Sequence, residues 1–159
     1  MLTVIKVGDK APDFTLPDTD LKPRNLNEFL RNKTLLAFFV GAFTSVYTKE
    51  MCTFRDSMAR LIDLKAQIVG IAVTDPFSNK AFAEKNMLAF PILSDYKREI
   101  IKAYGIQLPD FAGLKDYTTA KRSIFILDKD GIVRYVWITD TPAVEPNYGE
   151  IEDFLAKMR

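Results

Sequence analysis

The chain has 159 residues, of which 48% are hydrophobic, and this size and composition are typical of one folded domain with one core. Lysine and arginine together number 22 and aspartate and glutamate 21, so the net charge of +1 gives no electrostatic basis for binding nucleic acid or an anionic membrane. The sequence has no histidine and a single cysteine, which excludes His-ligated zinc, Ser-His-Asp hydrolysis and a disulfide within the chain.

No stretch of the sequence is long and apolar enough to span a bilayer, and residues 1–6 lack the pattern of a signal peptide. We therefore expect a cytoplasmic protein. No internal repeat, low-complexity stretch or linker interrupts the sequence, so residues 1–159 are expected to form a single domain. We expect neither a metal nor a cofactor.

The predicted elements begin with an extended or turn-rich opening over residues 8–24, which carries three prolines. Asn25-Leu-Asn-Glu28 is a capping box that predicts a short helix ending near Arg31. The apolar run over 33–40 predicts a strand buried on both faces. Apolar residues at steps of three and four then predict an amphipathic helix over 45–65, with Thr44 or Ser45 as its cap.

The second half of the chain continues this alternation. In chain order, the sequence predicts a buried strand over 67–74, a turn at 75–78, a helix over 79–88, a strand over 90–93 and a helix over 97–104. A long loop over 106–121, strands over 123–127 and 132–139, and a closing helix over 148–158 follow. Asp128-Lys-Asp-Gly131, placed between two predicted strands, predicts a hairpin turn. A calcium site is not expected there, because the segment lacks the further ligands of a twelve-residue calcium loop.

This order of strands and helices predicts an α/β fold with helices on both faces of a central sheet. The terminal hairpin makes the sheet mixed rather than wholly parallel. The arrangement resembles the thioredoxin plan, with an N-terminal extension and one extra helix.

The most informative stretch is Val40-Gly-Ala-Phe-Thr44-Ser-Val-Tyr47, where a predicted strand ends and a helix begins. α/β proteins place their sites at such junctions, and the N–H groups of the helix start favour an anion there. The frame resembles the Pro-x-x-x-Thr-x-x-Cys motif of peroxiredoxins. Thr44 matches, whereas Val40 replaces the proline and Tyr47 replaces the peroxidatic cysteine. The following Thr48-Lys-Glu-Met-Cys52 resembles the Q-type, or bacterioferritin comigratory protein-like, subfamily, in which Cys52 corresponds to the resolving cysteine.

The resemblance also covers residues 8–14 and 122–131, and it implies a thioredoxin-like fold of the peroxiredoxin variety. It implies reduction of hydrogen peroxide or alkyl hydroperoxides by a thiolate, which a thioredoxin-like reductant then regenerates. Arg122 corresponds to the arginine that stabilises the thiolate, and Thr44 to the residue that positions the peroxide. The resemblance further implies a monomer or a homodimer.

Tyr47 cannot perform this chemistry, because a phenol ionises only near a pKa of about 10 and forms no counterpart of a sulfenic acid. Cys52 lies five residues further on, roughly 140° round the helix and one turn from its start, where a thiolate is not favoured. We therefore predict that this chain lacks peroxidase activity.

Two functional interpretations remain open at this point. The chain is either a thiol peroxidase scaffold in which Tyr47 is an engineered or natural substitution, or a non-catalytic relative that acts by binding, regulation or a chaperone-type role. Simpler alternatives also stand for the single residues: Cys52 as a small core residue, Tyr47 as a plug of the pocket, Thr44 as a helix cap, and Arg122 as a surface arginine.

Overall fold

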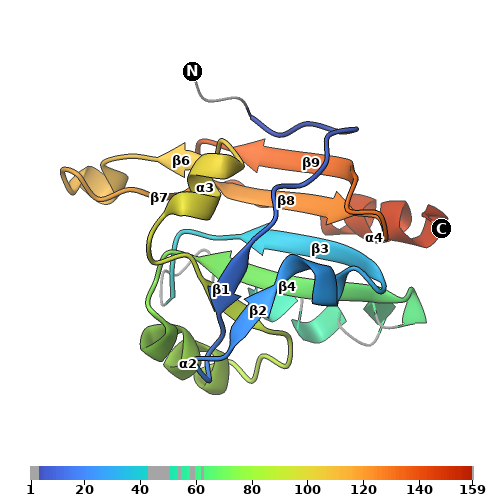
Figure 1. The fold of residues 1–159 in the computed structure, drawn as a ribbon, viewed down its shortest axis with the longest axis horizontal. Coiled ribbons are helices and arrows are strands. Elements are labelled where there is room, and N and C mark those ends of the chain that lie inside the picture. The colour runs from blue at the N-terminus through green and yellow to red at the C-terminus, as the bar shows by residue number, and fades with distance from the viewer. Residues whose placement is uncertain (1–3, 43–50, 54, 58–59, 62, 159) are drawn as a thin grey trace.

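The computed structural model describes residues 4–42, 51–53, 55–57, 60, 61 and 63–158. At its centre lies a mixed sheet with the strand order β5-β4-β3-β8-β9 (Figure 1). Its strands are β3 (Lys33–Phe38), β4 (Ala66–Ala72), β5 (Ile92–Ser94), β8 (Arg122–Leu127) and β9 (Val133–Thr139). The first three are parallel, whereas β8 runs antiparallel to β3 and β9 antiparallel to β8. The predicted mixed α/β sheet is therefore confirmed.

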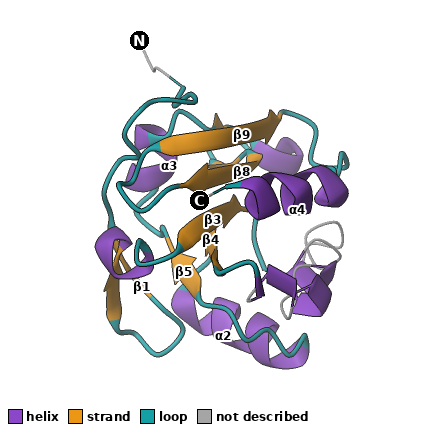
Figure 2. Cartoon of the chain, turned by 90° about the vertical axis from the view of Figure 1, so that its right-hand side faces the viewer, coloured by secondary structure: helices purple, strands orange, loops and turns teal. Residues whose placement is uncertain are grey.

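Both faces of the sheet are covered, as the alternating order of elements predicts (Figure 2). One face packs against α2 (Pro76–Lys85), α4 (Tyr148–Lys157) and the described helical residues Met51 and Leu61. The other packs against α3 (Glu99–Ala103), the hairpin of β1 (Thr15–Pro17) and β2 (Pro23–Asn25), and the 3-10 helix η1 (Leu26–Phe29). Successive strand residues point to opposite faces, so Leu35 joins the first core and Leu36 the second.

Asn25 is confirmed as the helix cap, although the helix it starts is shorter than predicted and the Glu28 carboxylate pairs with Arg24 instead of completing a capping box. The Asn25 side chain accepts a hydrogen bond from the Glu28 N–H at 3.2 Å. The helix that follows is a single 3-10 turn that ends at Phe29 rather than near Arg31. Because β3 already begins at Lys33, the chain has no room for a further turn.

The start of α2 corrects the prediction of a turn at 75–78. The helix begins at Pro76, three residues before the predicted start, and ends at Lys85. Asp75 is its cap and accepts hydrogen bonds from the N–H of Ser78 at 2.8 Å and from its hydroxyl at 2.9 Å. Proline is favoured in the first helical turn, where its missing N–H is not needed.

The predicted loop over 106–121 contains short ordered elements, which is a second correction. They are β6 (Gln107–Leu108), the 3-10 turn η2 (Phe111–Gly113) and β7 (Thr119–Ala120), and β6 pairs antiparallel with β7. Two-residue strands are too short to leave an alternating pattern in the sequence. Thr119 and Ala120 are nevertheless fully buried.

The strands of the central sheet, α3 and α4 agree with their predictions to within about two residues. The start of the helix predicted over 45–65 lies outside the described residues. α3 is followed by Gly105 in the left-handed conformation, with φ 72°. In the β8–β9 turn, Asp128 accepts backbone N–H bonds from Asp130 and Ile132. Its second oxygen accepts a bond from Arg134, so this carboxylate serves the hairpin rather than a calcium ion. In the described ranges no helix is long and apolar enough to cross a membrane.

The segment 8–11 runs along the start of the edge strand β9. Gly8 N–H donates to the Val133 carbonyl at 2.8 Å, and Val133 N–H donates to the Asp9 carbonyl at 2.9 Å. Lys10 and Ile132 form an isolated antiparallel bridge. Part of the outer edge of β9 is therefore paired by the beginning of the chain.

Candidate active site

The loop 39–42 follows β3 at the carboxyl edge of the sheet, which is the predicted place of the site. In the register between β3 and β8, Phe38 is the partner of Ser123. Arg122, the first residue of β8, therefore stands beside the first residues of this loop. The register thus places Arg122 at the same edge of the sheet as Val40. The position of Arg122 relative to Tyr47, which the peroxiredoxin resemblance implies, lies outside the described residues.

Arg122 is fully buried, so the alternative of a surface arginine is wrong. Its Nη1 donates to the carbonyl oxygens of Pro142 at 3.1 Å and Val144 at 2.8 Å. A buried guanidinium is costly unless its donors are satisfied. The loop that follows β9 supplies these acceptors and fixes the orientation of the guanidinium plane.

Val40 is 2% exposed and is held through its backbone. The Thr119 hydroxyl, also buried, donates to the Val40 carbonyl at 2.6 Å. Within the described ranges, the Val40 N–H donates no hydrogen bond. Thr119 was not among the predicted site residues, because it lies in the stretch predicted as a loop and no spacing in the sequence links it to Val40.

The next two residues of the loop are fixed by the end of β4. The Ala42 N–H donates to the Thr74 hydroxyl oxygen at 3.0 Å. A Cβ at Gly41 would lie 2.8 Å from the same oxygen, so only glycine fits this approach. The Thr74 carbonyl in turn accepts from the buried side chains of Asn79 and Ser94. Hydrogen bonds through Thr74 therefore connect this loop to buried polar side chains.

Cys52 lies in a helical segment and is partly exposed. Its Sγ lies 3.6 Å from the Asn86 Oδ1, and the neighbouring Arg55 donates to the Asn86 carbonyl at 2.8 Å. Asn86 ends α2, so the thiol is directed toward the end of that helix. Thr44 and Tyr47, together with the predicted helix cap, lie outside the described residues.

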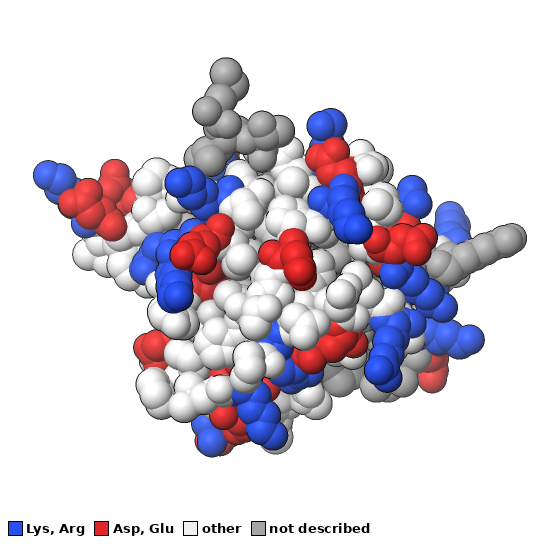
Figure 3. Space-filling view, in the orientation of Figure 1, with Lys and Arg blue, Asp and Glu red and all other residues white. Residues whose placement is uncertain are grey.

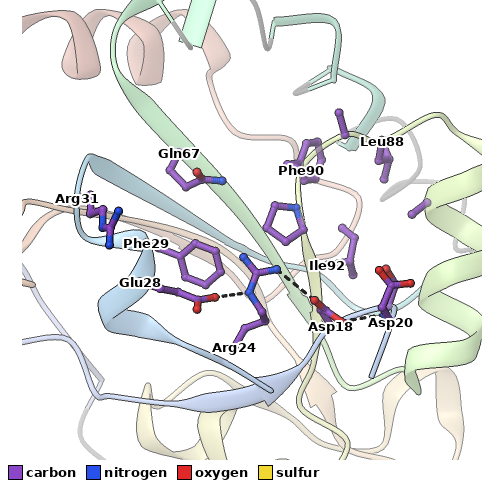
Figure 4. A pocket seen from close by; sticks show the side chains of 14 residues that line it. Asp18, Asp20, Arg24, Glu28, Phe29, Arg31, Gln67, Leu88, Phe90 and Ile92 are labelled. Atoms are coloured by element: carbon purple, nitrogen blue, oxygen red, sulfur yellow. Dashed lines mark hydrogen bonds and ion pairs between the residues drawn. The ribbon is translucent and has the colours of Figure 1, made fainter. Parts of the chain in front are cut away.

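A cavity of about 650 Å³ lies away from this region, beside η1 and the segment before β5 (Figure 4). Its charged centre is Arg24, which pairs with Asp18 at 3.1 Å and with Glu28. The Arg24 guanidinium also lies 5.0 Å from the centre of the Phe29 ring. The charges of these groups compensate one another, and we assign no chemistry to this cavity.

Comparison with known proteins settles the family. The sequence model described as "AhpC/TSA family" matches residues 7–136, a span that includes Val40, Cys52 and Arg122. The chain belongs to the AhpC/TSA family. Among its curated relatives in this family, Peroxiredoxin Bcp of Escherichia coli (strain K12) is 34% identical over 134 residues, which cover 84% of this chain and 85% of the relative.

A second group of relatives in the AhpC/TSA family is longer. The chloroplastic Peroxiredoxin Q of Populus jackii is 35% identical over 133 residues, which cover 84% of this chain. The match covers 60% of that relative, so this chain spans about three fifths of its length.

Solved structures confirm the thioredoxin-like fold of the peroxiredoxin variety. Peroxidoxin BcpB from Mycobacterium tuberculosis superposes with a TM-score of 0.85 at 30% identity, covering 98% of this chain and 99% of the other. A peroxiredoxin-like protein from Aquifex aeolicus gives a TM-score of 0.84 at 26% identity, covering 96% of this chain and 87% of the other.

Proposed function

We propose that this chain is a thiol peroxidase scaffold whose turnover is abolished by Tyr47 at the peroxidatic position. The observation that carries the proposal is the buried Arg122 at the start of β8, whose guanidinium donates to two backbone carbonyls. A buried cation at the carboxyl edge of a sheet suits a thiolate and a peroxide. Tyr47 supplies no thiolate, and its phenol forms no sulfenic acid.

With a cysteine at position 47, the reaction would follow the chemistry of the family. The thiolate attacks one oxygen of the peroxide, the O–O bond breaks, and the other oxygen leaves as water or an alcohol after protonation. The Cys52 thiol then attacks the resulting sulfenic acid, releases water and forms a disulfide. A thioredoxin-like dithiol reduces that disulfide. In this proposal Thr44 positions the peroxide and Arg122 stabilises the thiolate.

We also propose a domain organisation, a cellular location and an oligomeric state for this protein. We place residues 1–159 in one domain, because the cores on both faces share the same central strands. We place the protein in the cytoplasm as a monomer or homodimer that binds neither nucleic acid nor membrane, in keeping with the net charge of +1.

The decisive experiment restores the missing thiol. The parent chain should consume hydrogen peroxide no faster than a blank that contains only reductant. Tyr47→Cys should become oxidised by peroxide faster than a free thiol, as followed by stopped-flow fluorescence. Mass spectrometry should then detect a disulfide between positions 47 and 52, whereas Tyr47→Ser, the matched control, should remain inactive.

Val40→Pro should increase the oxidation rate of the Tyr47→Cys variant. Proline would fix the backbone at a buried loop position whose N–H donates no hydrogen bond among the described residues. Two results would contradict the proposal. Turnover by the parent that disappears with Cys52→Ser would make Cys52 the attacking thiol. A folded double variant whose new thiol reacts no faster than a free one would favour the binding-protein interpretation.

A further inference from the structure

Three lysines meet at the end of the sheet opposite Val40 and Arg122. Lys33 opens β3, and its register partner is Ala66, so Lys65 stands directly beside it. On the other side Thr34 pairs with Leu127, which places Lys129 just beyond the end of β8. Figure 3 shows Lys and Arg side chains gathered at the right-hand end of the molecule, where β3 and β4 begin. The strand register alone therefore brings these lysines together.

The three side chains line one cavity of about 250 Å³, together with Asn32 and Met158. None of these lining residues is acidic, and no ion pair within the described part of the chain involves the three lysines. Lys33 Nζ donates to the Leu155 carbonyl at 2.7 Å, near the end of α4. An ammonium group has three N–H donors, and this hydrogen bond uses only one of those of Lys33.

The electrostatics of this cavity favour an anion. Burial lowers the pKa of Lys33, and the charges of Lys65 and Lys129 lower it further. Three like charges around one cavity repel one another in the absence of a counter-charge. A multivalent anion bound among the three lysines would attract each of them and so offset this repulsion.

The backbone of Lys65 makes a clean substitution possible. Lys65 has a φ of 60°, in the left-handed region, between the helical residue 63 and the start of β4. Glycine is the residue expected at such a helix end, since it adopts this conformation without strain. Lys65 is one of seven described non-glycine residues with a positive φ, and glycine can replace it there without strain.

We propose that Lys33, Lys65 and Lys129 form a binding site for the phosphate or pyrophosphate group of a small molecule. The three lysines line a compact cavity rather than a long stripe, which suits one or two phosphate groups better than a polymer. The near balance of charges over the whole chain also argues against a long polyanion.

The test uses the full chain and pyrophosphate, titrated by calorimetry in a phosphate-free buffer of low ionic strength. The parent should bind pyrophosphate in a saturable way, and added salt should weaken the binding. The double variant Lys65→Gly/Lys129→Ala should bind about tenfold more weakly or worse, because it loses two charge-assisted contacts. Lys65→Gly alone should unfold at the same or a higher temperature than the parent, because glycine adopts the left-handed conformation without strain.

Lys115→Ala is the surface control, since Lys115 is exposed in the loop between β6 and β7 and its loss removes one of the two positive charges that the double variant loses. This variant should bind as the parent does. Equal weakening by Lys115→Ala would overturn the proposal in favour of non-specific attraction. Absence of saturation at about 10 mM pyrophosphate would also overturn it. Binding that is seen only with phosphatidylcholine vesicles carrying a phosphoinositide would overturn it as well, because the phosphate group would then belong to a membrane lipid.

Discussion

At the scale of single residues, Arg122 is the side chain whose burial has to be compensated. Taking a guanidinium out of water costs several kcal/mol unless hydrogen bonds replace the lost hydration. The carbonyls of Pro142 and Val144 provide part of this compensation, and both belong to the loop after β9. The orientation of Arg122 therefore depends on a loop far from it in sequence.

Replacing Arg122 by methionine tests this dependence. Arg122→Met keeps the length of the side chain but leaves two carbonyl acceptors without their donor, so the free energy of unfolding should fall by about 2–4 kcal/mol. Urea denaturation measures the change. The control is Arg134→Met on β9, where a half-exposed guanidinium pairs with Asp128 at 2.7 Å and should cost less than about 1 kcal/mol. Equal losses would show that the two carbonyls do not depend on Arg122.

The same residues show what the sequence can predict of a site. A motif frame and its flanking residues predict Val40 and Arg122 as site residues, and the register of β3 and β8 puts both at the same edge of the sheet. Thr119 was missed because its hydroxyl meets the Val40 carbonyl only after the chain has folded. The burial of Arg122 was not predictable either, since lysine and serine flank it in the sequence.

At the scale of elements, the strands were easier to predict than the helix ends. β3, β4 and β8 are continuous apolar runs that suit burial on both faces. The start of α2 was mistaken for a turn because Asp75-Pro76 fits both a turn and a capped helix start. The hydrogen bond from the Ser78 N–H to the Asp75 carboxylate in the folded chain favours the capped helix start over the turn.

Asp95 governs how the stability of α3 responds to pH. Asp95 is 1% exposed, and its carboxylate accepts hydrogen bonds from the N–H groups of Ile100 and Ile101. Burial raises the pKa of Asp95 and the charge of Glu99 adds to this, although the backbone N–H groups act in the opposite direction. The folded protein therefore holds this proton to a higher pH than the unfolded chain does.

The contribution of Asp95 to stability should accordingly fall as the pH rises. Between the unfolded pKa of about 3.9 and the raised folded pKa, the folded state binds more protons, so the free energy of unfolding decreases with pH. Asp95→Asn retains an acceptor for the α3 N–H groups but cannot titrate. Urea midpoints measured over a pH series should show a decline in the parent that is smaller in the variant. Parallel curves would mean that Asp95 titrates normally.

At the scale of the whole molecule, β3 should be the slowest part to open. It lies between β4 and β8 and is covered on both faces, and Leu35 to Phe38 are fully buried. In hydrogen exchange followed by mass spectrometry, peptides from β3 and β8 should exchange only through global unfolding. Peptides from the β1–β2 hairpin and from 110–117 should exchange much earlier. Equal protection of the β1–β2 hairpin and β3 would contradict this ordering.

The pairing of residues 8–11 with Val133 and its neighbours has a consequence for self-association. A sheet edge with free N–H and C=O groups is a template on which a second chain can add a strand. The beginning of the chain occupies part of that template on β9. Proteolytic removal of residues up to 11 would free the Val133 backbone groups while leaving the central strands in place. The trimmed protein would then be prone to aggregate through its edge while still folded.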